Sequence, residues 1–328
     1  MYLSKNNIPT KFHPLLPIVT HTPPWLLELP HTVFDLLETK KAPSNNFEIQ
    51  NQLSEILNSR FKDATRCYTD GSKTNQGVGC SFSIQDSVSY FRLKNLLSAY
   101  SAELTAILLC LEEISQLQTN TEYLILTDSL SALQALNNLY SSHPIVQRIL
   151  TIHQALIENK TKINFIWIPG HSGIMGNESV DTAARNATTL EENIQNKIPS
   201  RDIKIFIKQK ISENWQKLWN QQENKNHLHQ IKKSVFPWPK SQIQRSRREE
   251  TTITRLRMGH SRLTHSFIFL NLYPPTCSLC SSDKALTVSH LLTECPVAID
   301  ELGKVQIKSL LTDPLHIKNV LNFLNRHE

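Results

Sequence analysis

A series of short apolar runs separated by turn residues predicts three successive strands in the first half of the chain. They cover residues 67–70, 77–84 and 87–93, and the short connections between them favour antiparallel pairing. In residues 101–117, apolar side chains then recur about every 3.6 positions, which is typical of an amphipathic helix. The apolar positions of this helix are Leu104, Ile107, Leu108, Leu111 and Ile114.

Two further strands alternate with three helices after this point. The strands are predicted at residues 123–127 and 162–168, and the helices at 128–137, 144–159 and 177–190. Asp128 or Ser129 caps the first of these helices, and Pro144 stands at the favoured first position of the second. Asn177 is expected to cap the third. The order βββαβααβα predicts an α/β fold: a mixed five-stranded sheet with flanking helices and crossover connections only after the third strand.

The flanking segments differ in composition from this unit. Six prolines precede residue 31, so residues 1–60 are predicted to be a linker with one short helix from about Glu48 to Arg60. A polar stretch follows Glu191, and after it come a basic helical segment and a cysteine-containing tail. We therefore expect three parts, namely a linker at 1–60, an α/β domain at 61–192 and a mainly helical basic appendage at 193–328.

Charge is unevenly distributed along the 328 residues. The net charge of +6 includes a block at 201–260 with 14 Lys and Arg against 5 Asp and Glu, so this block carries +9 and the remainder −3. Such a block is typical of proteins that contact nucleic-acid phosphates. A solvated helix face is an equal alternative. The candidate phosphate contacts are Arg245, Arg247, Arg248, Arg255 and Arg257.

The apolar runs are too short to cross a membrane. Runs such as 123–126 and 165–168 have strand length, whereas a spanning helix needs about 18 residues or more. Residues 1–9 lack the apolar stretch of a signal peptide. We therefore expect an intracellular protein of the nucleus or cytoplasm, not secreted, whose six cysteines are thiols or metal ligands.

Four short segments each supply one carboxylate at the end of a predicted strand or inside a predicted helix. They are Tyr68-Thr-Asp-Gly-Ser72, Ser101-Ala-Glu-Leu104, Leu126-Thr-Asp-Ser129 and Gly170-His-Ser-Gly-Ile-Met-Gly-Asn-Glu-Ser-Val-Asp181. Taken singly, Asp70 could be a turn residue, Asp128 an N-cap and Glu103 a solvated acid of a first helical turn. Taken together, carboxylates at one sheet edge repel one another unless a cation neutralises them, and Mg²⁺ prefers such oxygen ligands. The segments therefore predict a two-metal nuclease centre.

These motifs and the order of elements, over roughly residues 66–190, resemble the type 1 ribonuclease H family. The resemblance implies a ribonuclease H-like fold and metal-dependent cleavage of the RNA strand of an RNA/DNA hybrid, leaving 5′-phosphate and 3′-hydroxyl ends. It also implies two Mg²⁺ ions, which Mn²⁺ can replace. The metal-binding carboxylates of the family fall on Asp70, Glu103, Asp128 and Asp181.

The resemblance also places the family's mobile-loop histidine at His171. Gly170, Gly173 and Gly176 surround it and are expected to let the loop move, so that His171 acts as a proton acceptor or shuttle. Further candidate contacts with the hybrid are the backbone groups of Gly71 and Ser72 and the side chain of Asn177.

Two other functions are compatible with these patterns. One is a catalytically idle nucleic-acid-binding module of the same fold, which loss of a carboxylate would have indicated, but all four carboxylates are in place. The other is a DNA transposase or integrase-like nuclease of the wider superfamily, which the Gly-His-Ser-Gly loop disfavours.

The tail contains a set of residues with zinc-binding spacing. Cys277-x₂-Cys280-x₉-His290-x₄-Cys295 offers three thiolates and one imidazole for a tetrahedral Zn²⁺ ion, and free thiols are the alternative. The preceding segment, Arg255-Leu-Arg-Met-Gly-His260, together with this set resembles the region downstream of ribonuclease H in polyproteins of insect-type non-LTR retrotransposons. That resemblance implies a reverse transcriptase as partner in a parent polyprotein, with residues 1–60 as the remnant of the connection to it.

Overall fold

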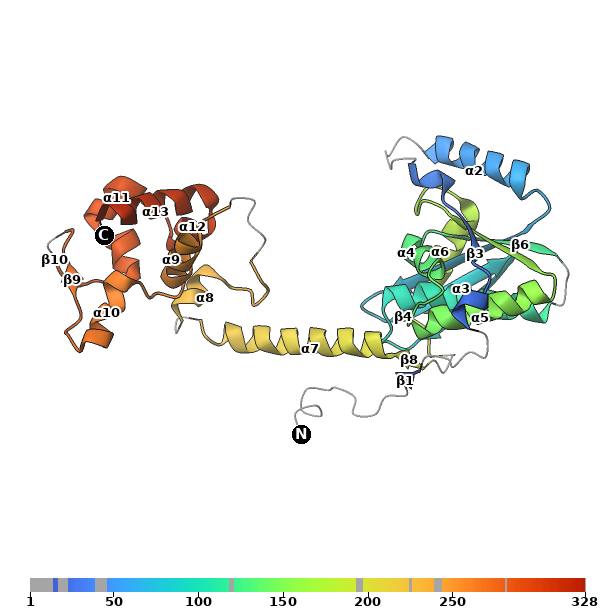
Figure 1. The fold of residues 1–328 in the computed structure, drawn as a ribbon, viewed down its shortest axis with the longest axis horizontal. Coiled ribbons are helices and arrows are strands. Elements are labelled where there is room, and N and C mark those ends of the chain that lie inside the picture. The colour runs from blue at the N-terminus through green and yellow to red at the C-terminus, as the bar shows by residue number, and fades with distance from the viewer. Residues whose placement is uncertain are drawn as a thin grey trace. The chain divides into compact units, whose positions relative to one another are not determined.

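The computed structural model of the chain divides into two compact units, Met1–Lys208 and Gln209–Glu328 (Figure 1). It describes residues 14–16, 23–38, 46–117, 121–192, 197–223, 226–238, 244–280 and 282–327. The division between the units falls inside helix α7 (Ser200–Asn220), rather than at the predicted domain boundary near residue 192. Each unit is built around its own apolar core.

A six-stranded mixed sheet forms the centre of the first unit. Its strands, in spatial order, are β2 (His31–Val33), β7 (Lys162–Trp167), β6 (Glu122–Thr127), β3 (Thr65–Lys73), β4 (Val78–Ile84) and β5 (Ser87–Leu93). The β3–β4–β5 part is antiparallel, and β3, β6, β7 and β2 run parallel. The α/β class, the mixed sheet and the five predicted strands are confirmed.

The sixth strand comes from the segment predicted to be a linker. In β2, Thr32 pairs with Phe165 of β7, and His31 Nδ1 lies 2.8 Å from Asn164 Oδ1. Helix α2 (Asn46–Arg60) confirms the predicted helix and begins two residues earlier. It buries Ile49, Leu53 and Leu57 in the same core as the sheet, and these parts of residues 1–60 therefore belong to the first unit.

Other parts of the segment before residue 61 are short. They comprise β1 (Pro14–Leu15), which pairs in parallel with β8 (Ile198–Pro199), and the 3₁₀ turns η1 (Pro24–Leu26) and η2 (Asp35–Glu38). Expectations for residues 1–13, 17–22 and 39–45 lie outside the described residues.

The helices of the first unit follow the predicted pattern closely. They are α3 (Ala99–Gln116), α4 (Leu130–Leu136), α5 (Pro144–Glu158) and α6 (Met175–Ala187). Ser98 caps α3 by accepting a hydrogen bond from the Ser101 amide, and Pro144 occupies the first turn of α5. The predicted cap of α6 is wrong, because the helix begins at Met175 and Asn177 lies inside its first turn.

Helices α3 and α6 cover opposite faces of the sheet. Cys80 of β4 packs with Ala102 and Ala106 of α3, whereas the hydroxyl of the adjacent Ser81 donates to the backbone carbonyl of Val180 in α6 at 2.6 Å. Successive side chains of a strand point to opposite faces, so the two helices must lie on different sides. This explains why six of the seven β4 residues are buried, since a strand covered on both faces needs no polar side.

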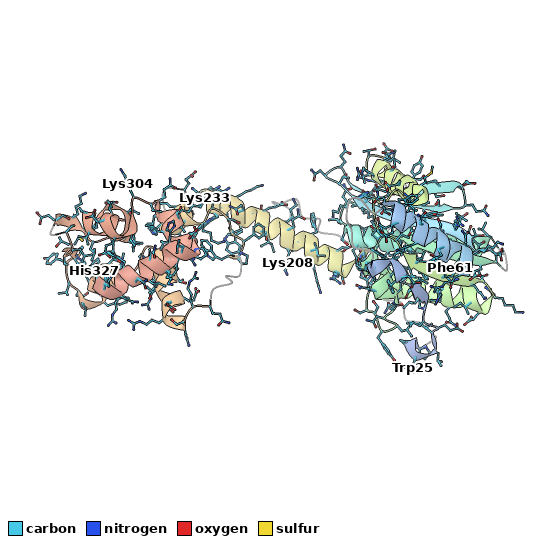
Figure 2. All side chains as sticks on the ribbon, turned by 90° about the horizontal axis from the view of Figure 1, so that it is seen from above. Trp25, Phe61, Lys208, Lys233, Lys304 and His327 are labelled. Carbon is cyan, nitrogen blue, oxygen red and sulfur yellow. The ribbon has the colours of Figure 1, made fainter. Side chains whose placement is uncertain are left out.

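The second unit is mainly helical, as predicted (Figure 2). Its elements after α7 are α8 (His227–Ile231), α9 (Arg247–Arg257), α10 (Arg262–Leu270), the hairpin β9 (Thr276–Cys277) and β10 (Ser282–Ala285), the π-helical turn η3 (His290–Glu294), α11 (Pro296–Leu302), α12 (Ile307–Thr312) and α13 (Pro314–His327). Ile253 and Leu256 of α9 pack with Val320 and Phe323 of α13 in its core. Within the described part of the chain, none of the helices is long and apolar enough to cross a membrane.

Candidate active site

Three of the four predicted carboxylates come together at one edge of the sheet. The last pair between β3 and β6 joins Thr69 to Thr127, so the next residues along are Asp70, inside β3, and Asp128, directly after β6. Glu103 reaches them from α3. One carboxylate oxygen from each of these three acids lies within 4.8 Å of the others.

Gly71 explains how a helix approaches the strand closely enough to bring Glu103 to this edge. A Cβ atom at Gly71 would lie 2.2 Å from the backbone nitrogen of Glu103 and 2.5 Å from the carbonyl carbon of Ala102. Any side chain there would push the start of α3 away from β3. The Gly71 amide also hydrogen-bonds the carboxylates of Asp70 and Glu103, which lowers the pKa of each.

Burial and mutual repulsion make this cluster unfavourable in its fully ionised form. Desolvation, followed by the charges of Asp128 and Asp181, raises the pKa of Asp70 to about 7, against an opposing effect of His171. Desolvation and the charges of Asp70 and Asp128 likewise raise the pKa of Glu103 well above its ordinary range. Glu103 Oε2 is buried and has no hydrogen-bond partner among the described residues. A bound cation would relieve both the repulsion and the unsatisfied oxygen.

Asp128 is oriented by groups from two neighbouring elements. The indole nitrogen of Trp167, at the end of β7, donates a hydrogen bond to the backbone carbonyl of Asp128 at 3.0 Å. Asn177 of α6 donates from Nδ2 to Asp128 Oδ2 at 3.4 Å and is only 3% exposed. Asn177 therefore positions a carboxylate in this structure.

The fourth predicted carboxylate, Asp181, belongs to an adjoining group. Its ligand atom lies within 4.8 Å of those of His171 and Glu178. The two groups are close enough that Asp181 and His171 both shift the pKa of Asp70. Glu178 was not among the predicted site residues. The signal that could have found it is its position three residues before Asp181, which places both on one face of α6.

The loop that carries His171 is more closely packed than its glycines suggested. A Cβ at Gly170 would lie 2.6 Å from Asp128 Oδ2, and one at Gly176 would lie 2.2 Å from the Tyr68 ring, so these two glycines permit close contact. His171 has a φ of 54° and is exposed, and Gly173 has a φ of 74°. Only Gly173 is required by its backbone conformation.

Cys277, Cys280, His290 and Cys295 converge in the second unit, with one ligand atom from each within 4.8 Å of the others. The Sγ atoms of Cys277 and Cys295 are 3.9 Å apart, and Cys280 Sγ is 3.5 Å from His290 Nε2. Hydrogen bonds, chiefly from Ser282, lower the pKa of Cys280 to about 6, whereas burial raises that of Cys295. The four residues thus form one compact cluster between the hairpin and α11.

The five predicted phosphate-binding arginines fall into two classes. Arg245 Nη1 pairs with Glu250 at 3.0 Å, and Arg257 donates to the Leu311 carbonyl at 2.9 Å while its guanidinium lies 4.4 Å from the centre of the Trp238 ring. These two arginines hold the second unit together. The side chains of the other three, Arg247, Arg248 and Arg255, are exposed on α9.

Comparison with known proteins bears on the first unit. Residues 62–189 match the family model of RNase H. No curated protein matches the chain. This part of the chain is therefore a type 1 ribonuclease H domain, an enzyme domain that binds RNA/DNA hybrids and acts on them as a nuclease.

Proposed function

We propose that the ribonuclease H domain of residues 62–189 hydrolyses the RNA strand of RNA/DNA hybrids by using divalent metal ions held by Asp70, Glu103, Asp128 and Asp181. The observation that carries this proposal is the convergence of three of these carboxylates at the sheet edge, with the fourth in the adjoining group. The products would be 5′-phosphate and 3′-hydroxyl ends.

The donor set suits a hard divalent cation. All four groups offer carboxylate oxygen, burial and mutual repulsion raise the pKa of Asp70 and Glu103, and Glu103 Oε2 lacks a partner among the described residues. Two bound Mg²⁺ ions, or Mn²⁺ in their place, would supply a nucleophilic water and stabilise the charge that develops on the leaving oxygen.

The chain's own residues would orient the carboxylates and move protons. Trp167 and Asn177 hold Asp128, and the Gly71 amide holds Asp70 and Glu103. We assign proton transfer to His171, which is exposed beside Glu178 and Asp181. We assign contacts with the hybrid to the backbone at Gly71 and to Ser72, both half-buried at the same sheet edge.

One assay tests this function against its alternatives. The purified full chain is incubated with labelled RNA/DNA hybrid, single-stranded RNA and duplex DNA, with Mg²⁺ or with EDTA. Metal-dependent cleavage of RNA in the hybrid alone supports the proposal. Binding without cleavage would indicate an idle nucleic-acid-binding module, and cleavage of duplex DNA would indicate a transposase-like nuclease.

We propose in addition that Cys277, Cys280, His290 and Cys295 bind a structural Zn²⁺ ion. Tetrahedral zinc with Zn–S of about 2.3 Å and Zn–N of about 2.0 Å has S···S edges of about 3.8 Å and S···N edges of about 3.5 Å. The observed separations of 3.9 and 3.5 Å agree with these edges. Glu294 Oε2 lies 3.8 Å from His290 Nδ1, where it could orient the ring. Metal analysis of the purified chain tests the assignment.

We also propose that the chain derives from a retrotransposon polyprotein that contains a reverse transcriptase. Support comes from the order of a ribonuclease H domain, the Arg255–His260 segment and the Cys/His set. Sequencing of the full transcript tests this origin, because a reverse-transcriptase reading frame should lie upstream and in phase.

A further inference from the structure

A basic cavity lies in the second unit, remote in sequence from the ribonuclease H domain. Its volume is about 400 Å³, and four arginines are among the nine residues that line it: Arg247, Arg248, Arg255 and Arg262. None of the nine is Asp or Glu, within the described part of the chain. The cavity therefore concentrates positive charge in one place.

Helix geometry explains why the arginines meet. Arg248 and Arg255 are seven residues apart on α9, and Arg247 is eight residues before Arg255, so all three occupy one side of the helix. Arg262 joins them from the first turn of α10. Like charges this close destabilise a helix surface unless an anion offsets them. The guanidinium group is the side chain best suited to bind phosphate oxygens in pairs.

The arginines that line the cavity differ in exposure from Arg245 and Arg257. Arg245 and Arg257 are turned to protein partners, Glu250 and the Leu311 carbonyl, and they contribute to folding. All four arginines of the cavity are exposed to solvent. The positive charge of the cavity is therefore accessible to a ligand from solvent.

Helix α10, whose first turn lines the cavity, also carries an exposed aromatic residue. Phe269 follows Arg262 by seven residues, which is two helical turns, so it lies on the same face about 10 Å further along. Its side chain is 88% exposed. Exposed aromatic rings next to basic grooves are the usual means of holding single-stranded nucleic acid, because bases stack on the ring while phosphates meet the cations.

We propose that the cavity formed by Arg247, Arg248, Arg255 and Arg262 binds backbone phosphates of single-stranded nucleic acid, with a base stacked on Phe269. This site is separate from the hydrolytic centre, and it does not depend on the nuclease function proposed above. It would bind a strand without choosing the bond that is cleaved.

The test measures binding of labelled oligo(U) RNA and oligo(dT), each about 15 nucleotides long, to the full chain by fluorescence anisotropy. The buffer contains no Mg²⁺ and no chelator, so that hydrolysis is prevented and any zinc is retained. The test variant is Arg255→Gln with Arg262→Gln. The control is Lys304→Gln with Lys318→Gln, which removes the same charge from exposed residues of the same unit that do not line the cavity (Lys304 in Figure 2).

Two lost phosphate contacts should lower the slope of log K against log salt by about 1.4 and weaken binding about 25-fold at roughly 0.1 M salt. The control variant should change binding by less than about threefold, and Arg255→Lys with Arg262→Lys should largely retain the salt slope. Phe269→Ala should weaken binding about fivefold or more without changing the slope. Comparison of the two oligonucleotides shows whether RNA or DNA is preferred.

Several results would overturn the proposal. These are equal losses in the test and control variants, a Lys variant as weak as the Gln variant, an unchanged affinity of Phe269→Ala, or an unmodified chain that binds neither oligonucleotide. Thermal melting of each variant separates loss of binding from loss of folding.

Discussion

Gln50 of α2 donates from Nε2 to the backbone carbonyl of Ser172 at 3.0 Å, across 122 residues of sequence, and to that of Gly173 at 3.1 Å. These carbonyls immediately follow His171 in the loop beside the carboxylates. Gln50 lies outside the matched residues 62–189, so a segment preceding the ribonuclease H domain fixes one of its loops. The apolar face of α2, buried in the core, anchors Gln50 in turn.

Gln50→Ala should slow hybrid cleavage by up to about 30-fold, because two hydrogen bonds of about 1 kcal/mol each hold the loop. The neighbouring Asn51→Ala, an exposed position of the same helix, is the matched control and should be neutral. Single-turnover rates measure the effect. If Gln50 acts by positioning His171, its substitution should add little in a His171→Ala background; full additivity would contradict that role.

His171→Ala should reduce the cleavage rate by about 10² to 10⁴-fold, which is the usual contribution of a proton-transfer group. Substitution of a metal-binding carboxylate should cost more, because water can partly replace an imidazole. A variant as inactive as Asp70→Asn would instead mean that His171 has a structural or ligand role.

Asp70→Asn should abolish cleavage and also change how stability depends on pH. Burial and its acidic neighbours raise the pKa of Asp70 to about 7 in the folded chain, so between about pH 4 and 7 the folded state binds a proton that the unfolded state has lost. The contribution of Asp70 to the stability of the metal-free protein should therefore fall as pH rises through this window, by up to a few kcal/mol.

Thermal melting without added metal at several pH values checks this dependence. Asp70→Asn should melt higher than wild type near pH 8 and show a weaker fall with pH. Added Mg²⁺ should raise the wild-type melting temperature most at high pH, because the metal competes with the proton. An Asp70→Asn variant whose stability has the same pH dependence as that of the wild type would contradict the arrangement.

A chain ending at Lys208 should fold and cleave hybrid with Mg²⁺, whereas one ending at Leu190 should be clearly less stable. Ile198 is 4% exposed and packs with Val78, Leu93 and Leu97, so the shorter chain loses this contact. Loss of a buried Ile side chain costs about 2 to 5 kcal/mol. Denaturant unfolding compares both truncations with Ile198→Ala in the full chain. Equal stability of the two truncations would show that residues 191–208 contribute nothing.

Cys280→Ser should eliminate bound zinc and lower the melting temperature of the second unit. Loss of one ligand of four disrupts a closed structural site. Cys110→Ser is the control: this cysteine is buried in the core of the first unit, so its substitution should reduce stability but leave about one zinc per chain. Metal analysis with thermal melting distinguishes the two, and wild-type protein free of zinc would remove the assignment.

The sequence was sufficient to predict the carboxylate set and the Cys/His set, because their positions depend on local geometry. Asp70 ends one predicted strand, Asp128 follows another, and Glu103 lies in the first turn of a predicted helix. Cys277 to Cys295 span a short stretch with ligand spacing, so local patterns were sufficient to propose each set. The antiparallel strands and amphipathic helices were predictable for the same reason, since their periodicity reflects which face each element buries.

Long-range contacts were decided only in the tertiary structure. Strand β2 has three residues and no visible period, and its partner Asn164 lies 133 residues from His31. Gln50 resembles any polar position of an amphipathic helix, and nothing local distinguishes Arg262, which lines the cavity, from Arg257, which packs on Trp238. The sequence alone determined which chemical groups this protein carries and the elements that present them. The folded chain decided which of those groups meet, because hydrogen bonds and side-chain packing between distant segments depend on distances in space that no local spacing encodes.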